Sequence, residues 1–388
     1  MVIATDRWDG PSMLPDGTPV LNAFASASSA RRAIASSAGR LLSHGWNAAR
    51  FLERRRRERA EKNVGECPSF AGPLSAAALL SRCVLSLRPR FVFGMEVFQH
   101  GMATALCKGV PRILMPWGGD IYLYPEASAV SSAMVRYALS RVDLVCPTSS
   151  SSVSHLVTRY GIPSRKIRVI SWGVDRLLFR RATAQRRKEV LARFGVDPEC
   201  DLFLNVRRFL PIWGCHIAME AFRRYAKENP RAHFAMLGGT GTDELVREAR
   251  KRLRAEGIED RFLLFEGDTP FSDCVDLMSV AEAYVSLMLV PDMRSFSILQ
   301  AAAAGGVPIL SHQPEYREME RMGFCALFVD PRNPESVAET MRECVRNGRK
   351  AEEIRQNNET YIAKHEDHEV QMQQLRAAIE EVCRVYGR

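Results

Sequence analysis

Short apolar runs alternate with segments of helical length from about residue 91 onward, which is the pattern of parallel βαβ units. A first series predicts strands over 90–95, 111–120, 143–149 and 166–173, with helices over 102–109, 131–142 and 152–161. A second series predicts strands over 201–209, 232–239, 261–267, 283–289 and 307–312, with helices over 216–229, 242–257, 271–280, 295–306 and 335–348. The last helical pattern covers 369–387, where Leu375, Ile379 and Val382 are expected in the core.

Two series of this kind predict two doubly wound α/β domains, and 388 residues exceed what one core usually supports. We expect an N-terminal domain over 1–178, a second domain over 179–360, and a C-terminal helix over 361–388 that crosses back to the first domain. The first 70 residues fit the pattern less well, so the first domain is expected to be reduced at its start or to begin late. In such sheets, ligands bind beyond the carboxyl ends of the strands.

Composition narrows the class of protein further. The ten cysteines form no CxxC pair or ligand spacing, which favours a cytoplasmic protein without disulfides or zinc. The apolar stretch over 70–87 contains Pro73 and Arg82 and is shorter than the roughly 20 residues of a membrane span, so we expect a buried helix there.

The positive charge is concentrated in the first half of the chain. Residues 1–178 hold 23 Lys and Arg against 12 Asp and Glu, whereas the remainder holds 31 against 33. The run "ERRRRERAEK" over 53–62 carries much of this surplus. It suits contact with an anionic membrane on the cytoplasmic face, and a solvated helix face accounts for it equally well.

The segment "PDMRSFSILQ" places an acid, hydroxyls and an amide around a predicted helix start. Ser295 or Ser297 is expected to cap the helix, whose free amides and dipole favour a phosphate. Asp292 can accept hydrogen bonds from sugar hydroxyls, and Gln300 can meet a ribose. An ordinary capped helix on a sheet is the structural alternative.

Four segments together resemble one known family: "KIRVISWGVDRLLF", "NVRRFLPIWGCHIAMEAF", "HFAMLGGTGTDEL" and "PDMRSFSILQAAAAGGVPILSHQPEYREM". They look like the retaining glycosyltransferases of family 4, and the likeness runs from about 91 to 348. The resemblance implies the GT-B fold, with two Rossmann-like domains facing across a cleft. It also implies a donor site near Arg294, Ser295, Phe296 and Ser297, where Gln300 replaces the second acid of the family's acidic pair.

A second motif of this family supplies an arginine and a lysine to the donor's diphosphate. Arg208 matches the arginine, but Trp213 stands where the lysine is expected. Arg207 takes the place of a glycine and, like Arg294, is a candidate to supply the missing charge. A surface cation at a strand end is the structural alternative for Arg208.

In the first domain, "PWGGDIY" resembles the family's HGxD turn. Gly118, Gly119 and Asp120 fit it, while Trp117 replaces the histidine and cannot exchange protons. These four residues are assigned to the acceptor side. His100 lies near a strand end that faces the cleft in the family, so it is a candidate for catalysis or acceptor contact as well as for a structural role.

The glycine-rich turn "GGTGTDE" is also typical of a different class of protein, the dinucleotide-binding enzymes. Gly239 and Gly241 fit part of a dinucleotide-binding fingerprint, but Glu244 stands where the third glycine belongs. An NAD-dependent oxidoreductase is therefore one alternative. In the family resemblance, the same glycines line the donor's phosphate side.

The resemblance implies a retaining hexosyltransferase that moves a sugar from a nucleotide-sugar donor to a glycan or lipid-linked acceptor, in surface polysaccharide or glycoconjugate synthesis. Arg208, Asp292 and His100 are its expected catalytic residues. No cofactor, metal or nucleic acid is expected, because the nucleotide sugar is a co-substrate and no acidic cluster suits a metal. The replacements at Trp117, Trp213 and Gln300 keep a second alternative open, an inactive nucleotide-sugar-binding protein.

Overall fold

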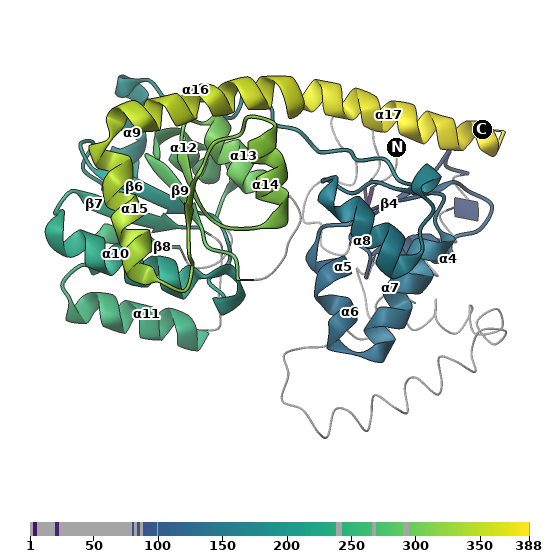
Figure 1. The fold of residues 1–388 in the computed structure, drawn as a ribbon, viewed down its shortest axis with the longest axis horizontal. Coiled ribbons are helices and arrows are strands. Elements are labelled where there is room, and N and C mark those ends of the chain that lie inside the picture. Colours follow the sequence, from purple (N-terminus) through teal and green to yellow (C-terminus); the bar gives the residue numbers. More distant parts are fainter. Residues whose placement is uncertain are drawn as a thin grey trace. The chain divides into compact units, whose positions relative to one another are not determined.

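A computed structural model describes residues 3–5, 20–22, 80, 84–85, 88–98, 100–237, 243–265, 269–289 and 295–387. The chain forms two compact units (Figure 1). The first unit comprises Met1–Thr148, Ser152–Ile170 and Leu375–Arg388, and the second comprises Ser149–Ser151 and Ser171–Gln374. The predicted domain boundary near 178 and the predicted C-terminal helix that crosses back to the first domain remain predictions.

The second unit is built on a parallel sheet with strand order β11-β10-β9-β6-β7-β8. Its strands are β6 (Asp201–Asn205), β7 (Ala232–Met236), β8 (Phe262–Leu264), β9 (Ala283–Ser286), β10 (Val307–Ser311) and β11 (Leu327–Val329). Chain order runs outward from β6 to β8 on one side and from β9 to β11 on the other. The direction of winding therefore reverses between β6 and β9, which is where such sheets bind ligands.

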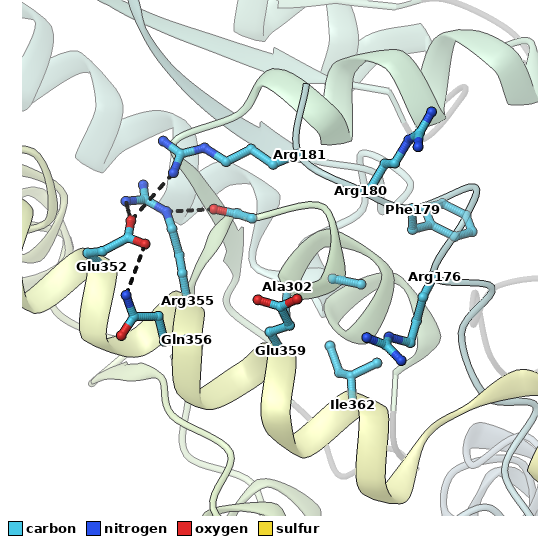
Figure 2. A pocket seen from close by; sticks show the side chains of 12 residues that line it. Arg176, Phe179, Arg180, Arg181, Ala302, Glu352, Arg355, Gln356, Glu359 and Ile362 are labelled. Atoms are coloured by element: carbon cyan, nitrogen blue, oxygen red, sulfur yellow. Dashed lines mark hydrogen bonds and ion pairs between the residues drawn. The ribbon is translucent and has the colours of Figure 1, made fainter. Parts of the chain in front are cut away.

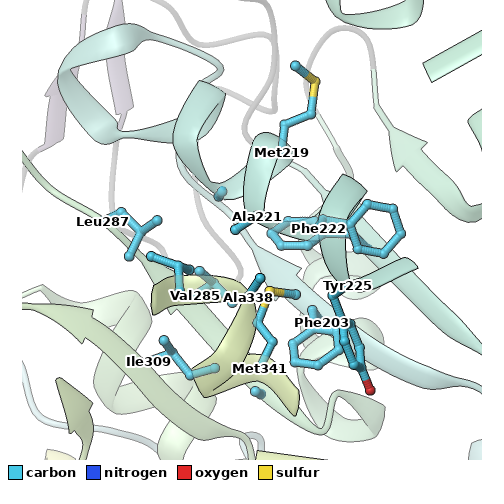
Figure 3. Close-up of a cluster of buried hydrophobic side chains, with 14 of the residues drawn as sticks. Phe203, Met219, Ala221, Phe222, Tyr225, Val285, Leu287, Ile309, Ala338 and Met341 are labelled. Atoms are coloured by element: carbon cyan, nitrogen blue, oxygen red, sulfur yellow. The ribbon is translucent and has the colours of Figure 1, made fainter. Parts of the chain in front are cut away.

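Helices cover both faces of this sheet because alternate residues of each strand point to opposite sides. Phe203 of β6 belongs to the core on one face, here called the first-face core, together with α10 (Cys215–Glu228), α11 (Asp243–Ala255) and α15 (Pro334–Arg346). Figure 3 shows part of this core, in which Phe203 and Phe222 lie among Val285, Ile309 and Met341. The neighbouring Leu202 and Leu204 belong to the core on the other face, here called the second-face core, together with α9 (Ala184–Arg193), α12 (Phe271–Val280), α13 (Phe296–Ala303) and α14 (Pro314–Arg321).

The first unit holds a smaller parallel sheet, in the order β3-β4-β5. Its strands are β3 (Val92–Met95), β4 (Arg112–Met115) and β5 (Leu144–Val145), and a separate parallel pair joins β1 (Ile3–Thr5) to β2 (Val20–Asn22). Its helices are α4 (His100–Leu106), α5 (Gly119–Tyr122), α6 (Tyr124–Ala127), α7 (Ala129–Arg141) and α8 (Ser151–Tyr160). The parallel sheets of both units confirm the predicted α/β class.

The predicted strand over 166–173 is wrong. That segment makes only a bridge from Ile167 to Val145, beside the hydrogen bonds that Arg168 and Ile170 donate to Val145 and Pro147. Because β5 is two residues long, the edge it offers is too short for a full strand.

Besides the long helix α16 (Gly348–His365), two shorter α-helices and one strand of the second unit were not predicted. Helix α9 begins in the polar segment "RATAQRRKEV", where Thr183 accepts a hydrogen bond from the N–H of Arg186 as the N-cap. Helix α14 and strand β11 lie between the predicted strand over 307–312 and the predicted helix over 335–348. All three are short or polar, so their hydrophobic period is weak.

Two long helices end the chain, α16 (Gly348–His365) and α17 (His368–Val385). Leu375 of α17 is buried as expected, whereas Ile379 and Val382 are only half-buried, and Ala378 and Cys383 take the buried positions. No helix in the described part of the chain is long and apolar enough to cross a membrane.

Candidate functional site

The carboxyl ends of β6 and β9 meet at the point where the sheet of the second unit reverses its winding. Asn205 ends β6, is fully buried, and donates its side-chain amide to the carbonyl of Val285 at 2.6 Å. Its side-chain oxygen accepts the N–H of Arg207 at 2.6 Å. Asn205 thus fixes the exit of β6 against β9 and sets the direction of the arginine pair that follows.

Arg207 packs against an aromatic ring at this strand end. Its guanidinium carbon lies 4.7 Å from the ring centroid of Trp213, and one guanidinium nitrogen lies 3.6 Å from the sulfur of Met288. Trp213 closes the short 3₁₀ helix Pro211–Trp213 and packs on the first-face core. The tryptophan that replaces the expected lysine therefore holds a different cation by its π face.

A close backbone approach fixes Trp213. Gly214 has φ of 65°, and a Cβ placed there would lie 2.0 Å from the carbonyl oxygen of Leu287. Only glycine allows both this conformation and this proximity. The loop after β6 is thereby pressed against the end of β9.

The start of α13 lies beside the same strand ends. Ser295 is the N-cap residue, as predicted, but its side chain makes no capping hydrogen bond. Its hydroxyl lies 3.0 Å from that of Ser297, which accepts a hydrogen bond from Tyr284 at 2.8 Å. Burial raises the pKa of Tyr284, and the positive charge of Arg207 opposes that rise.

Arg208 differs from its neighbour in its surroundings. Its side chain is exposed, and its carbonyl accepts hydrogen bonds from the N–H of Leu210 at 2.7 Å and the thiol of Cys215 at 3.0 Å. Two cations thus follow β6, one packed on Trp213 and one directed to solvent.

Of the other residues predicted to bind the donor, two lie in α13 and four lie outside the described residues. Phe296 and Gln300 are half-buried residues of α13, with Gln300 as its fifth residue. Asp292, Gly239, Gly241 and Arg294 lie outside the described residues. The structure therefore brings together Arg207, the serines and α13 at one sheet edge.

Asp120 has a structural role in the first unit. Its carboxylate accepts the N–H groups of Val97 at 2.7 Å, Trp117 at 3.0 Å and Gly118 at 2.7 Å. The side chain is buried, and this burial raises its pKa to about 6 although the hydrogen bonds act in the opposite direction. Asp120 therefore joins the loops after β3 and β4 from within.

Trp117 lies on the surface of the same turn, and 54% of the residue is exposed. Gly118 has φ of 112° and precedes Gly119, the first residue of α5. The predicted acceptor-side residues thus divide into an exposed aromatic ring and a buried group that holds the turn.

His100 begins α4 near the end of β3. Its Nδ1 lies 2.9 Å from the carbonyl of Met95, which requires a proton on Nδ1 and leaves Nε2 able to accept one. Glu96 adopts φ of 76°, and its carboxylate accepts the N–H groups of Phe98 and His100. Sequence reasoning missed Glu96, because left-handed backbone at a charged residue leaves no sequence signal.

The described residues hold eight free cysteines, and no group of three or more His, Cys, Asp or Glu among them suits a metal. Most of these thiols are buried, and burial raises the pKa of Cys146 and Cys344 to about 12. These two thiols therefore remain protonated and belong to the packing of the units.

Comparison with protein families identifies the second unit. A family model described as "Glycosyl transferases group 1" matches residues 152–361, more than half of the chain. The chain belongs to this family. A second model, described as "Glycosyltransferase Family 4", matches residues 38–176. No curated protein matches the sequence.

Solved glycosyltransferases show how this group 1 member folds. HepE from Anabaena, in complex with UDP-glucose, is 18% identical, with a TM-score of 0.67 over 80% of this chain and 82% of its own. Sucrose-phosphate synthase from Thermosynechococcus elongatus is 15% identical, with a TM-score of 0.67 over 83% and 81%. A glycosyltransferase from Rickettsia africae is 16% identical, with a TM-score of 0.63 over 83% and 84%. The predicted GT-B fold and glycosyltransferase class are confirmed.

Proposed function

We propose that this glycosyltransferase moves a hexose from a nucleoside diphosphate sugar to a glycan or lipid-linked hydroxyl with retention of anomeric configuration, as in family 4. The supporting observation is the position of Arg207. Its guanidinium packs on Trp213 after the end of β6 and lies beside Met288 after the end of β9. A diphosphate at this edge would meet a cation and free helix amides together.

The nucleotide is proposed to lie over the second unit. Arg207 and Arg208 would bind the diphosphate with the amides of 295–297, and Gln300 would bind the ribose. Asp292, with Gly239, Gly241 and Arg294, would complete the sugar and phosphate contacts. Among the nucleotides, UDP is the first candidate, because HepE was solved with UDP and with UDP-glucose.

The reaction breaks the bond between the anomeric carbon and the diphosphate oxygen. The acceptor oxygen forms the new bond on the same face, and the departing phosphate takes the acceptor's proton. The arginines stabilise the negative charge that grows on the leaving diphosphate, so positioning and electrostatics carry the rate. This route uses no metal and no side-chain base.

The acceptor is proposed to bind the first unit near Trp117. An exposed ring on a rigid turn suits stacking on a sugar, and Asp120 holds that turn from below. His100 offers Nε2 to an acceptor hydroxyl. A lipid-linked acceptor would place the enzyme on the cytoplasmic face of a membrane, for surface polysaccharide or glycoconjugate assembly.

The test is a thermal-shift panel of UDP, GDP, ADP, their common sugar conjugates and NAD against the full chain. A ligand that binds only the folded protein raises its melting temperature. We expect a shift with one nucleoside diphosphate and a larger one with its sugar conjugate. The Arg207→Ala variant should lose most of that shift, whereas the exposed Arg349→Ala should keep it.

Turnover separates the remaining alternatives. Slow release of free sugar from the bound donor would establish transfer chemistry, since water can replace the acceptor. Donor binding without release under every acceptor would favour an inactive nucleotide-sugar-binding protein. A shift with NAD alone would overturn the proposal.

A further inference from the structure

The turn that follows Val174 displays two leucines to solvent. The side chain of Asp175 accepts the N–H groups of Leu177 at 2.9 Å and Leu178 at 3.1 Å, and Phe179 is buried in the second-face core. Leu177 is 82% exposed and Leu178 is 42% exposed. Because the turn is fixed at both ends, these leucines are held outward and cannot fold back onto the core.

A third apolar side chain extends this surface. Phe271 begins α12 and is 62% exposed, and its ring centroid lies 6.1 Å from that of Phe179. Two segments about 90 residues apart thus meet at the buried Phe179, which directly follows the two exposed leucines in the chain and packs against the exposed Phe271. Single exposed apolar residues are common, but a group of this kind indicates a contact surface.

Arginines flank the leucines on both sides. A cavity of about 220 Å³ lies beside the turn. Figure 2 shows side chains that line it, among them four arginines and two glutamates: Arg176, Arg180, Arg181, Arg355, Glu352 and Glu359. It lies at the C-terminal end of α13, whereas the candidate donor site lies at the start of that helix.

The ion pairs leave positive charge near the leucines. Glu352 contacts Arg181 at 3.5 Å and Arg355 at 3.6 Å, and Arg355 also contacts Glu282 at 3.0 Å, so both arginines have carboxylate partners. Arg176 and Arg180 are exposed and make no ion pair with any residue that the structure describes. Arg176, directly before the leucines, and Arg180, two residues after them, are thus available to an external anion.

We propose that this leucine turn, residues 175–181 together with Phe271, docks on an anionic lipid bilayer. The leucines and the phenylalanine enter the interfacial region, while Arg176 and Arg180 bind lipid phosphates at headgroup depth. The proposal uses no residue of the basic run over 53–62, which lies outside the described residues, and it does not depend on the donor chemistry.

The size of the surface favours a bilayer over a protein partner. Three apolar side chains cover far less than the roughly 800 Å² that each partner contributes to a stable protein interface. A membrane needs no matching shape, and shallow apolar insertion and arginine–phosphate contacts add to each other.

The experiment measures flotation of the full chain with phosphatidylcholine vesicles, with and without phosphatidylserine. Replacing Arg176 and Arg180 with Ala should weaken binding to the anionic vesicles roughly 25-fold, at about fivefold for each arginine near the surface. Leu177→Ser with Leu178→Ser should weaken it about tenfold or more. The control pair is Arg321→Ala with Met322→Ser, an exposed arginine and methionine at the end of α14.

Each outcome bears on the proposal. Loss of binding in both leucine-turn variants but not in the control supports it, provided that melting temperature and UDP shift stay unchanged. Full binding by these variants, with loss only when Arg54 to Arg57 are reversed, assigns the membrane contact to the N-terminal run and overturns it. So does a concentration-dependent dimer that the leucine variants abolish. The UDP shift distinguishes these failures from a failure of the proposed function.

Discussion

Trp213 should act on the donor only through Arg207. Replacing Trp213 with Leu keeps an apolar side chain on the first-face core but removes the ring beneath the guanidinium. A cation–π contact that is partly shielded from water contributes about 1 to 2 kcal/mol, so affinity for the nucleoside diphosphate should fall at most about 5- to 30-fold. Arg207→Ala removes a charged hydrogen bond to phosphate, at about 1.5 to 3 kcal/mol, or roughly 10- to 150-fold.

A double-mutant cycle measures the coupling between the two residues. Calorimetric titration with UDP or the preferred nucleotide should show that Trp213→Leu weakens binding in the parent but adds nothing in the Arg207→Ala background. Trp213→Lys should recover affinity relative to Trp213→Leu, because it supplies a cation at the same position. Additive effects of the two single changes would refute the coupling.

The matched control for this cycle lies in the first unit. Arg141 packs on the ring of Tyr137 with 5.3 Å between guanidinium carbon and centroid, which is a contact of the same kind on α7. Tyr137→Leu should leave nucleotide affinity unchanged. An equal loss in this variant would mean that the titration reports general destabilisation.

Four further predictions concern single residues. Arg208→Ala should weaken nucleoside diphosphate binding by about 1.5 to 3 kcal/mol in the same titration, and unchanged affinity would remove Arg208 from the site. Gln300→Glu should tighten binding several-fold, since a charged acceptor binds a ribose diol more strongly than an amide, unless Gln300 does not contact the ribose. Gly173→Ala should lower the melting temperature, because φ is 66° and the new Cβ would lie 2.6 Å from the Cα of His368. Burial raises the pKa of Asp120 from 3.8 to about 6, so the folded protein binds more protons than the unfolded chain between these values. Urea unfolding should therefore show about 2 kcal/mol of stability lost as the pH rises from 4 to 6, and Asp120→Asn should remove that slope.

The sequence predicts elements well where a short apolar strand is followed by a long amphipathic helix. Strands β6 and β9 have strong patterns and form within the predicted ranges, and helix α10 begins one residue before its predicted start. The segment over 166–173 is equally apolar, yet it forms a single bridge because its neighbour β5 is only two residues long. Whether an apolar run becomes a strand depends on the length of its partner, which no local pattern contains.

The candidate site was predictable in position but not in the roles of its residues. The turn "PWGGD" marks a functional loop, but the sequence does not distinguish the exposed Trp117 from the buried Asp120. The serines at the start of α13 predict a capping hydrogen bond. Ser295 is the N-cap residue, but the structure links the hydroxyl of Ser297 to those of Tyr284 and Ser295 instead. Hydrogen bonds between segments that are distant along the chain decide these roles, and they follow only from the folded sheet.

The pair formed by Arg207 and Trp213 shows why substitutions at a site should be judged together. Considered alone, Trp213 removes a cation from the diphosphate site, and Arg207 adds one where a glycine is expected. Since the guanidinium lies over the ring, the two replacements amount to moving one positive charge from the start of α10 to the end of β6. The number of cations at the switch point is then unchanged, and the tryptophan supplies the orientation that a lysine would obtain from its own helix. On this basis we expect an active enzyme with a rearranged diphosphate site.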